Sequence, residues 1–290
     1  MTETTPTPTS SLTAEDLADR RATFAALHQA GCFVMPNPWD VGTARALASL
    51  GFPALATTSA GFGFSRGRPD TPTALSVDEV LAHVADLTGA TDLPVNADFQ
   101  AGYAADAEGV ATNVARCIEA GVSGLSIEDA TGRRDAPLFE LGEAVERLAA
   151  ARAAIDTSGT GVLLTARAES FLVGLDEPLA DAIERLAAYA RAGADVLFAP
   201  GLRTPEDIRV VVEAAGATPV NVLIGWADGP SVSELAGLGV RRISVGSAMA
   251  RAAWGGLLRA AEALQQGSFT GLADAAPFVR LNDLFSATGA

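Results

Sequence analysis

Eight short runs rich in β-branched residues recur along this chain of 290 residues, and a helical pattern separates each run from the next. The runs are continuously apolar rather than alternating, which is typical of strands buried on both faces of a parallel sheet. These runs are Phe33–Pro36, Ala54–Thr58, Val95–Asp98, Gly124–Glu128, Val162–Ala166, Val196–Ala199, Val220–Ile224 and Arg242–Val245.

The segments between the runs are alanine-rich and amphipathic, and their ends carry helix signals. Ser76 with Glu79, and Ser231 with Glu234, have the spacing of a capping box. Eight strand–helix units in one chain predict a closed (β/α)8 TIM-type barrel. A doubly wound open sheet is the alternative, but no GxGxxG pattern follows the first run, which argues against the dinucleotide-binding form of that fold.

The two ends of the chain extend this scheme. A helix over about Ala14–Ala30 is expected before the first strand, where it can close the barrel floor. Ala248–Gln266 is interpreted as the last barrel helix, and the apolar segment Phe269–Phe285 after it needs a surface to pack on. Residues 1–11 are rich in Thr and Pro and are expected to form a flexible tail, while residues 12–290 are predicted to form a single barrel domain.

The basic residues narrow the possible chemistry. All 20 Lys-plus-Arg positions are arginine, so the chain has no lysine. This excludes Schiff-base aldolases, pyridoxal phosphate enzymes and Walker-type phosphate binding, because each requires a lysine amine. The formal net charge of −15 argues against nucleic acid as a partner, because an acidic surface repels phosphates.

The sequence indicates an intracellular protein without a membrane span. No apolar run approaches the roughly 18 residues of a membrane helix, and the first residues lack the basic and apolar regions of a secretory signal. Cys32 and Cys117 lie in apolar contexts far apart, so we expect buried free thiols. His28 and His83 fall within helical patterns and are interpreted as ordinary helix residues. The expected compartment is the reducing cytoplasm.

Acidic residues close two neighbouring strands of the predicted barrel. Active sites of such barrels lie at the carboxyl ends of the strands, so the Asp98 and Glu128 carboxylates should approach one another there. With no lysine nearby, a divalent cation, most plausibly Mg2+, would supply the counter-charge. The alternative is a carboxylate held by Arg167 or Arg133 without a metal. Arg167 can also clamp a substrate carboxylate, unless it only forms a salt bridge to Glu169 or Glu128.

Two loops on the same face are candidates for binding or gating. The loop at about 59–74 follows the second strand and is long enough for a gate. At its start Thr58, Ser59 and Ala60 are small enough for backbone N–H groups to approach an anion, although a solvated turn is the alternative. The loop at 130–139 is polar and is a candidate lid.

Several of these segments, taken together and in this order, resemble the isocitrate lyase/phosphoenolpyruvate mutase superfamily. The resemblance runs from about Phe33 to about Ala261. The segments that carry it are Pro36-Asn37-Pro38-Trp39-Asp40, Thr58-Ser59-Ala60-Gly61, Gly67-Arg68-Pro69-Asp70, Asp98-x-Gln100-x-Gly102-Tyr103, Ile127-Glu128-Asp129 and Thr165-Ala166-Arg167.

The resemblance implies an α/β barrel that binds Mg2+ and a small 2-oxo or 2-hydroxy acid. It also implies homo-oligomers, as dimers or tetramers, in which the last barrel helix is exchanged between subunits. The residue roles that it implies are Asp98 as direct metal ligand, Glu128 as ligand through water, Asp70 as the acid of the strand-2 loop, Thr58, Ser59 and Ala60 at the substrate oxyanion, Arg167 at the substrate carboxylate and Asn221 at a distal carboxylate.

The departures from the family pattern concern charge and catalysis. Gln100 stands where the family has a second acid, so a metal site of Asp98, Gln100 and Glu128 would have one charge fewer and lower affinity. The Lys-Lys-Cys-Gly-His type of gating loop of the lyases is missing. Ala130 stands where the mutases have lysine, and Pro200 where the lyases have glutamate.

From these features we expect a Mg2+-dependent lyase or hydrolase that cleaves a C–C bond of a small 2-oxo or 2-hydroxy dicarboxylic acid through an enolate. Asp70 and Tyr103 are the candidates for moving protons or positioning water. One alternative is P–C bond chemistry on phosphonopyruvate or phosphoenolpyruvate, for which only Arg133 and Arg134 offer cations in the fourth loop. The other is a non-catalytic metabolite-binding barrel.

Overall fold

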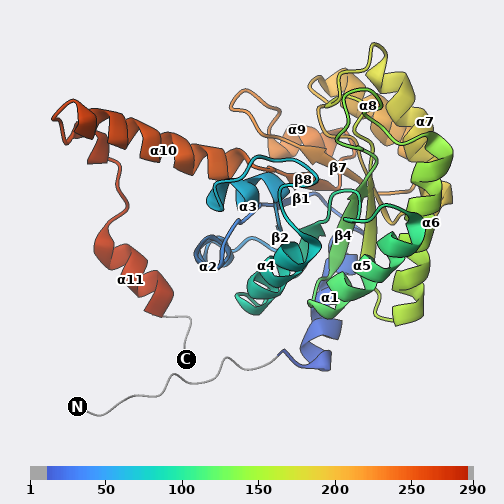
Figure 1. Ribbon diagram of the computed structural model, residues 1–290, viewed down its shortest axis with the longest axis horizontal. Helices are drawn as coiled ribbons and strands as arrows, with labels where there is room; N and C mark the ends of the chain where they lie inside the picture. The colour runs from blue at the N-terminus through green and yellow to red at the C-terminus, as the bar shows by residue number, and fades with distance from the viewer. Residues whose placement is uncertain (1–11, 287–290) are drawn as a thin grey trace.

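A computed structural model describes residues 12–286 and confirms the (β/α)8 TIM-type architecture (Figure 1). All neighbouring strands pair in parallel, in the order β1-β8-β7-β6-β5-β4-β3-β2. The strands are β1 (Phe33–Met35), β2 (Leu55–Ala56), β3 (Val95–Asp98), β4 (Gly124–Glu128), β5 (Leu163–Arg167), β6 (Val196–Phe198), β7 (Val220–Leu223) and β8 (Arg242–Ser244). Each lies within, or within one residue of, a run expected from the sequence.

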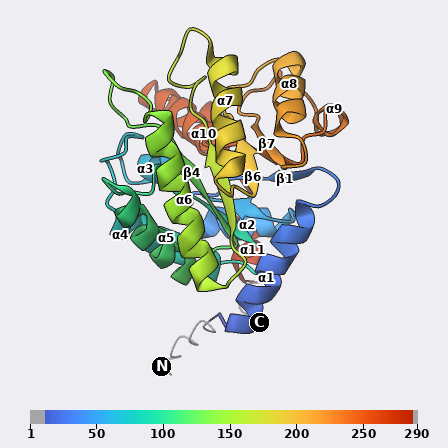
Figure 2. The same ribbon diagram turned by 90° about the vertical axis from the view of Figure 1, so that its right-hand side faces the viewer.

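Helices surround this sheet, and Figure 2 shows α4, α5, α6, α7 and α8 along its outside. Their N-terminal caps form as the sequence predicts: the Ser76 and Ser231 hydroxyls each accept a hydrogen bond from a glutamate amide three residues later. The helices are α1 (Ala14–Leu27), α2 (Val41–Ser49), α3 (Ser59–Ser65), α4 (Val77–Gly89), α5 (Ala107–Glu119), α6 (Leu141–Ser158), α7 (Pro178–Arg191), α8 (Pro205–Ala215), α9 (Val232–Gly237), α10 (Ala248–Gln265) and α11 (Phe278–Ser286), with the 3-10 helix η1 (Thr270–Leu272).

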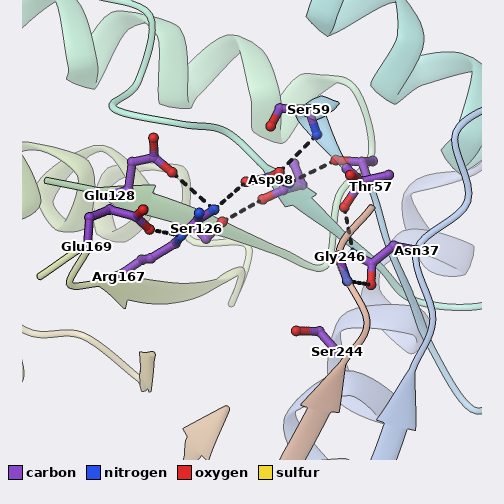
Figure 3. Close-up of polar contacts among 12 residues, drawn as sticks. Asn37, Thr57, Ser59, Asp98, Ser126, Glu128, Arg167, Glu169, Ser244 and Gly246 are labelled. Atoms are coloured by element: carbon purple, nitrogen blue, oxygen red, sulfur yellow. Dashed lines mark hydrogen bonds and ion pairs between the residues drawn. The ribbon is translucent and has the colours of Figure 1, made fainter. Parts of the chain in front are cut away.

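Strand pairing stops between β1 and β2, and there a backbone hydrogen bond and the Asn37 side chain close the barrel. β1 and β2 end the order of paired strands, and between them the Ala56 amide donates to the Pro36 carbonyl at 3.0 Å. The Asn37 side chain completes this seam (Figure 3). It donates to the Thr57 carbonyl at 2.9 Å and accepts from the amides that follow β8. One amide side chain therefore joins the ends of β1, β2 and β8.

Helix α1 covers the amino ends of the strands, as expected, and ends at Leu27, short of the predicted Ala30. Phe24 is fully buried, and the Arg21 guanidinium donates to the Val122 and Ile118 carbonyls. These contacts hold the helix across the barrel floor. The opposite end of the barrel is therefore the open one.

Two segments are more ordered than the sequence indicates. The loop expected at 59–74 contains α3, because the Thr58 hydroxyl accepts a hydrogen bond from the Gly61 amide and caps a helix. The apolar segment after α10 contains η1 and α11, and α11 packs on α2. The tail expected at 1–11 lies outside the described residues. Within residues 12–286, no helix combines the length and the hydropathy that a membrane crossing requires.

Candidate active site

The site is built around Asp98, the last residue of β3. Its amide donates to the Thr57 hydroxyl at 2.8 Å, and one carboxylate oxygen accepts from the Ser59 amide at 2.9 Å. Because Ser59 is the first residue of α3, the start of this helix orients the Asp98 carboxylate (Figure 3). The predicted anion-binding segment thus lies at the site, where one of its amides contacts a protein carboxylate.

The second acid, Glu128, lies beside Asp98, and Arg167 links the two. Arg167 Nη1 lies 3.3 Å from Asp98 Oδ1 and 3.0 Å from Glu128 Oε2. The Nε atom of Arg167 donates to Glu169 (Figure 3). Both carboxylates touch one nitrogen atom, so they lie close enough to share a single ion and its water shell. Arg167 therefore contacts both of the acids that were predicted as metal ligands.

This cluster holds more negative than positive charge. Asp70 approaches through the Ser59 hydroxyl, which donates to its carboxylate at 3.2 Å. Burial raises the pKa of Glu128 well above its ordinary value, and the neighbouring Glu169 and Asp98 carboxylates add to this, against the Arg167 charge. Burial and Asp98 also raise the pKa of Asp70. Four carboxylates lie around one guanidinium, which contacts three of them, so the cluster attracts a cation.

The donor set fits Mg2+. This ion takes oxygen ligands and is commonly held by one or two carboxylates, with water filling the other positions. Within residues 12–286 no group of three or more Asp, Glu, His or Cys side chains is arranged to hold a metal. A Mg2+ ion here would therefore have at most two charged ligands, Asp98 and Glu128, with water in the other positions. The buried Gln100 Oε1 atom makes no hydrogen bond to the described residues, and the Gln100 carbonyl accepts from the Glu128 amide at 2.9 Å. The Gln100 backbone thus lies against Glu128, and its side-chain oxygen is unengaged among the described residues.

Tyr103 is half-buried near the same acids, and its hydroxyl is shielded from solvent. Its ring packs edge-on against Phe99, with 5.2 Å between centroids, and no hydrogen bond from the described residues reaches its hydroxyl. Burial and the charges of Asp98 and Glu128 raise its pKa, so the hydroxyl stays protonated. Gln100 and Tyr103 both have positive φ angles, 42° and 51°. Strained backbone of this kind is concentrated at functional sites.

Two other predicted residues lie apart from the acids. Asn221 is 1% exposed, donates to the Ser244 hydroxyl at 3.0 Å and accepts from Arg242, so its amide is engaged deeper in the barrel. Arg133, a predicted substitute cation, pairs with Asp135 at 2.6 Å on the exposed loop after β4. That loop closes at its base through a bridge between residues 130 and 138.

One residue that supports the site received no role from the sequence. The Asp129 carboxylate is buried and accepts from the Glu169 amide at 2.8 Å, from Tyr189 at 2.6 Å and from Arg185 at 3.2 Å. It thereby ties the ends of β4 and β5 to α7. In the sequence, the only local sign that Asp129 supports the site is its position directly after Glu128. The partners of Asp129 lie 40 to 60 residues away along the chain.

A family model described as phosphoenolpyruvate phosphomutase matches residues 24–265. The chain is 29% identical over 216 residues to 2-methylisocitrate lyase of Halalkalibacterium halodurans, covering 70% of this chain and 66% of the relative. Among solved structures, it is similar to a protein of Burkholderia cenocepacia J2315 described as a lyase/mutase, at 48% identity and a TM-score of 0.90, over 93% of this chain and 98% of that one.

A third similarity is to oxaloacetate acetylhydrolase in complex with its product oxalate. The identity is 25% and the TM-score 0.82, over 92% of this chain and 94% of that one. The relatives are lyases, mutases and hydrolases of small organic acids. With the family model covering most of the barrel, the chain belongs to the phosphoenolpyruvate phosphomutase family, within the phosphoenolpyruvate mutase/isocitrate lyase superfamily.

Proposed function

We propose that this protein is a Mg2+-dependent lyase or hydrolase that cleaves a C–C bond of a small 2-oxo or 2-hydroxy dicarboxylic acid through an enolate. The observation that carries the proposal is the meeting of Asp98 and Glu128 on one Arg167 nitrogen at the open end of the barrel. Relatives that cleave or form C–C bonds next to a carboxylate, such as 2-methylisocitrate lyase, support it.

In this proposal Asp98 and Glu128 hold Mg2+, with the Gln100 oxygen beside them. When bound, Mg2+ supplies Lewis-acid stabilisation of the developing enolate. Arg167 then exchanges protein carboxylates for a substrate carboxylate, which its planar guanidinium can bind through two hydrogen bonds. Thr58, Ser59 and Ala60 would line the substrate side at the start of α3, where the Ser59 amide already donates to Asp98. Each preorganised N–H donor in such a site is worth roughly 2.7–4 kcal/mol.

Asp70 and Tyr103 are the proposed proton-handling pair. The raised pKa of Asp70 brings its carboxyl group closer to neutral pH, where a general acid or base is most effective. Tyr103 stays protonated and can donate a hydrogen bond from its unengaged hydroxyl. The charge of Asp98 raises the pKa of both groups, which supports placing them near an acid held there.

The test is turnover of a panel of small 2-oxo and 2-hydroxy dicarboxylic acids with Mg2+, with products identified by NMR. We expect C–C cleavage of at least one acid, loss of turnover on chelation of Mg2+, and a loss of at least about 100-fold with Asp98→Asn. Asp156→Asn is the matched control, because that exposed carboxylate pairs with Arg152 within α6. Absence of turnover across the panel would count against the proposal.

A second candidate is P–C bond chemistry, favoured by the description of the matching family. Phosphorus NMR of phosphonopyruvate and phosphoenolpyruvate incubated with the protein and Mg2+ separates it from the first. If neither reaction occurs while oxalate still binds, and Asp98→Ala changes only that binding, the barrel is a non-catalytic metabolite-binding protein.

A further inference from the structure

A second arginine lies on the barrel axis, below the acidic cluster. Arg242 belongs to β8 and is 2% exposed. Its Nε donates to Asn221 Oδ1 at 2.8 Å and its Nη2 donates to the Thr165 hydroxyl at 3.0 Å. Its Nη1 lies 3.3 Å from His28 Nε2, at the C-terminal end of α1. The side chain therefore crosses the barrel interior just above the floor.

The partners of Arg242 are all neutral. His28 Nδ1 lies 2.8 Å from the Phe24 carbonyl, which can only accept, so Nδ1 carries the proton and Nε2 accepts from Arg242. Burial and the Arg242 charge lower the pKa of His28 to about 3, so the imidazole is uncharged at neutral pH. Burial lowers the pKa of Arg242 to about 9, which still leaves it protonated.

Arg242 therefore carries a buried positive charge without a counter-charge from the described residues. Other buried arginines differ: Arg185 pairs with Asp129 and Asp181, and Arg167 with three carboxylates. Arg21 and Arg147 donate to main-chain carbonyls, the negative ends of peptide dipoles. An unpaired buried charge is costly and is normally compensated by an anion. Among these buried arginines, Arg242 is therefore the one whose charge a bound anion would compensate most.

A cavity of about 40 Å³ opens directly above Arg242. One water needs roughly 10–15 Å³ by this measure, so the space holds about three non-hydrogen atoms, the number in a carboxylate group. The walls include the polar Asn96, Ser126 and Ser244 and the apolar Met35, Phe198 and Leu223. Asp98 and Arg167 also border the cavity. Arg167 and the Ser59 amide offset part of the Asp98 charge, while the Arg242 charge attracts an anion to the cavity.

The donors of Arg242 match such a ligand. A guanidinium has five N–H donors in one plane, and the described residues use three of them. The two that remain, together with the Ser244 hydroxyl that borders the cavity, can donate to a carboxylate. Figure 3 shows Ser244 below Asn37 and Gly246, at the level beneath the Asp98 cluster.

We propose that this cavity is a carboxylate subsite, and that Arg242 is its cation. It rests on the proposed function for one point: the carboxylate belongs to a small acid whose other end lies at Asp98 and Glu128. The cavity holds little beyond that group, so the acid must be slim and without a branch at the inserted end. Arg242 is then a specificity-determining residue for diacids.

The test is calorimetric titration of the metal-free wild-type protein with formate, with formamide as the uncharged probe of the same size. We expect formate to bind, formamide not to bind, and Arg242→Gln to weaken formate binding at least tenfold. Arg21→Gln is the matched control, since it removes a buried arginine from the floor but leaves the cavity unchanged. Formate binding that Arg242→Gln leaves unchanged would overturn the proposal, as would no binding by the wild type.

If Arg242→Gln fails to fold, a crystal of the wild-type protein soaked in bromide decides the question by anomalous scattering. A bromide peak in contact with the Arg242 guanidinium supports the subsite, and peaks only elsewhere overturn it. The two proposals fail separately. Formate binding that depends on Arg242 without turnover of any acid leaves the subsite standing, whereas turnover with formate binding independent of Arg242 leaves the proposed function standing.

Discussion

Single residues at this site act mainly through their charge. How deeply each charged group is buried, and whether an opposite charge lies against it, determine its role. Arg167 and Arg242 are both buried arginines in one barrel, yet the first touches three carboxylates and the second touches neutral groups. The same contrast applies to the acids. Asp129 is fully hydrogen-bonded by α7 and Glu169, whereas Asp70 has a single hydroxyl contact and a raised pKa.

Asp129→Asn should destabilise the protein more than Tyr189→Phe. The first change removes one partner of a buried ion pair and leaves Arg185 only its pair with the less buried Asp181, and breaking a buried pair typically costs about 3–5 kcal/mol. The second removes one hydrogen bond and leaves the ion pair, at a cost of about 1–3 kcal/mol. Urea denaturation of both variants measures the difference. Equal losses would show that the ion pair contributes nothing beyond the tyrosine hydrogen bond.

His83 should make the protein sensitive to acid. Its ring stacks on Phe62 at 3.8 Å, its Nε2 has no partner among the described residues, and burial lowers its pKa to about 4. The unfolded chain, with a pKa near 6.5, takes up the proton first. The stability due to His83 is therefore complete above about pH 6.5 and is lost as the pH falls toward 4.

His83→Phe removes this titration and keeps a stacked ring. The unfolding free energy of the variant should fall less than that of the wild type between pH 6.5 and 4, by an amount on the order of 2–3 kcal/mol. Thermal unfolding measured at several pH values provides the comparison. Part of the slope should remain, because His28 has a pKa of about 3 and the same sign. Parallel pH profiles would contradict the prediction.

Elements, rather than residues, bring the acidic cluster together. Parallel pairing sets Asp98 opposite Ser126, and Glu128 opposite Arg167. These side chains thus emerge at one end of neighbouring strands. Helix α3 adds the third component, because its first amide holds the Asp98 carboxylate. A short helix in the second loop therefore determines how the acid of the third strand is oriented.

Thr58→Ala should weaken the start of α3. The Thr58 hydroxyl accepts from the Gly61 amide, and loss of such a cap costs about 1 kcal/mol. Thr58→Ser keeps the hydroxyl and should cost less. The unfolding free energy in urea distinguishes the two variants, and Mg2+ affinity should fall more for Thr58→Ala because the Ser59 amide loses its fixed position. Identical behaviour of the two variants would show that the cap is dispensable.

At the scale of the whole molecule, α10 extends away from the barrel (Figure 1). Several of its apolar side chains are exposed. Leu257, Leu258 and Trp254 are 56%, 55% and 39% exposed. Contiguous apolar surface of this kind usually marks an interface between proteins. We therefore propose the homo-oligomer expected from the sequence, with α10 as the element that contacts or exchanges with a second copy.

The double change Leu257→Glu and Leu258→Glu should lower the molar mass in solution by dissociating this assembly. Two charges in an apolar interface are costly to bury, so the monomer should predominate. Light scattering coupled to size-exclusion chromatography measures the mass. Val210→Glu on α8 is the control, since it changes an exposed apolar residue elsewhere and should leave the mass unchanged. A wild-type protein that is already monomeric would contradict the proposal.

The local pattern of the sequence determined which segments become strands and helices, because apolar runs, capping residues and chain length act within a few residues. The same pattern predicted that Asp98, Glu128 and Arg167 lie at one end of the barrel, because all three residues end predicted parallel strands or directly follow one. The resemblance to a known superfamily supplied their roles, and those roles stay predictions.

Only the tertiary structure decided what those residues touch. Asn37 closes the barrel through amides 208 and 209 residues away, Arg242 meets His28 across 214 residues, and Asp129 meets Tyr189 across 60. No periodicity or cap signal relates positions so far apart. Hydrogen bonds and charge compensation inside a barrel depend on which side chains packing brings into contact, and that is a property of the assembled fold.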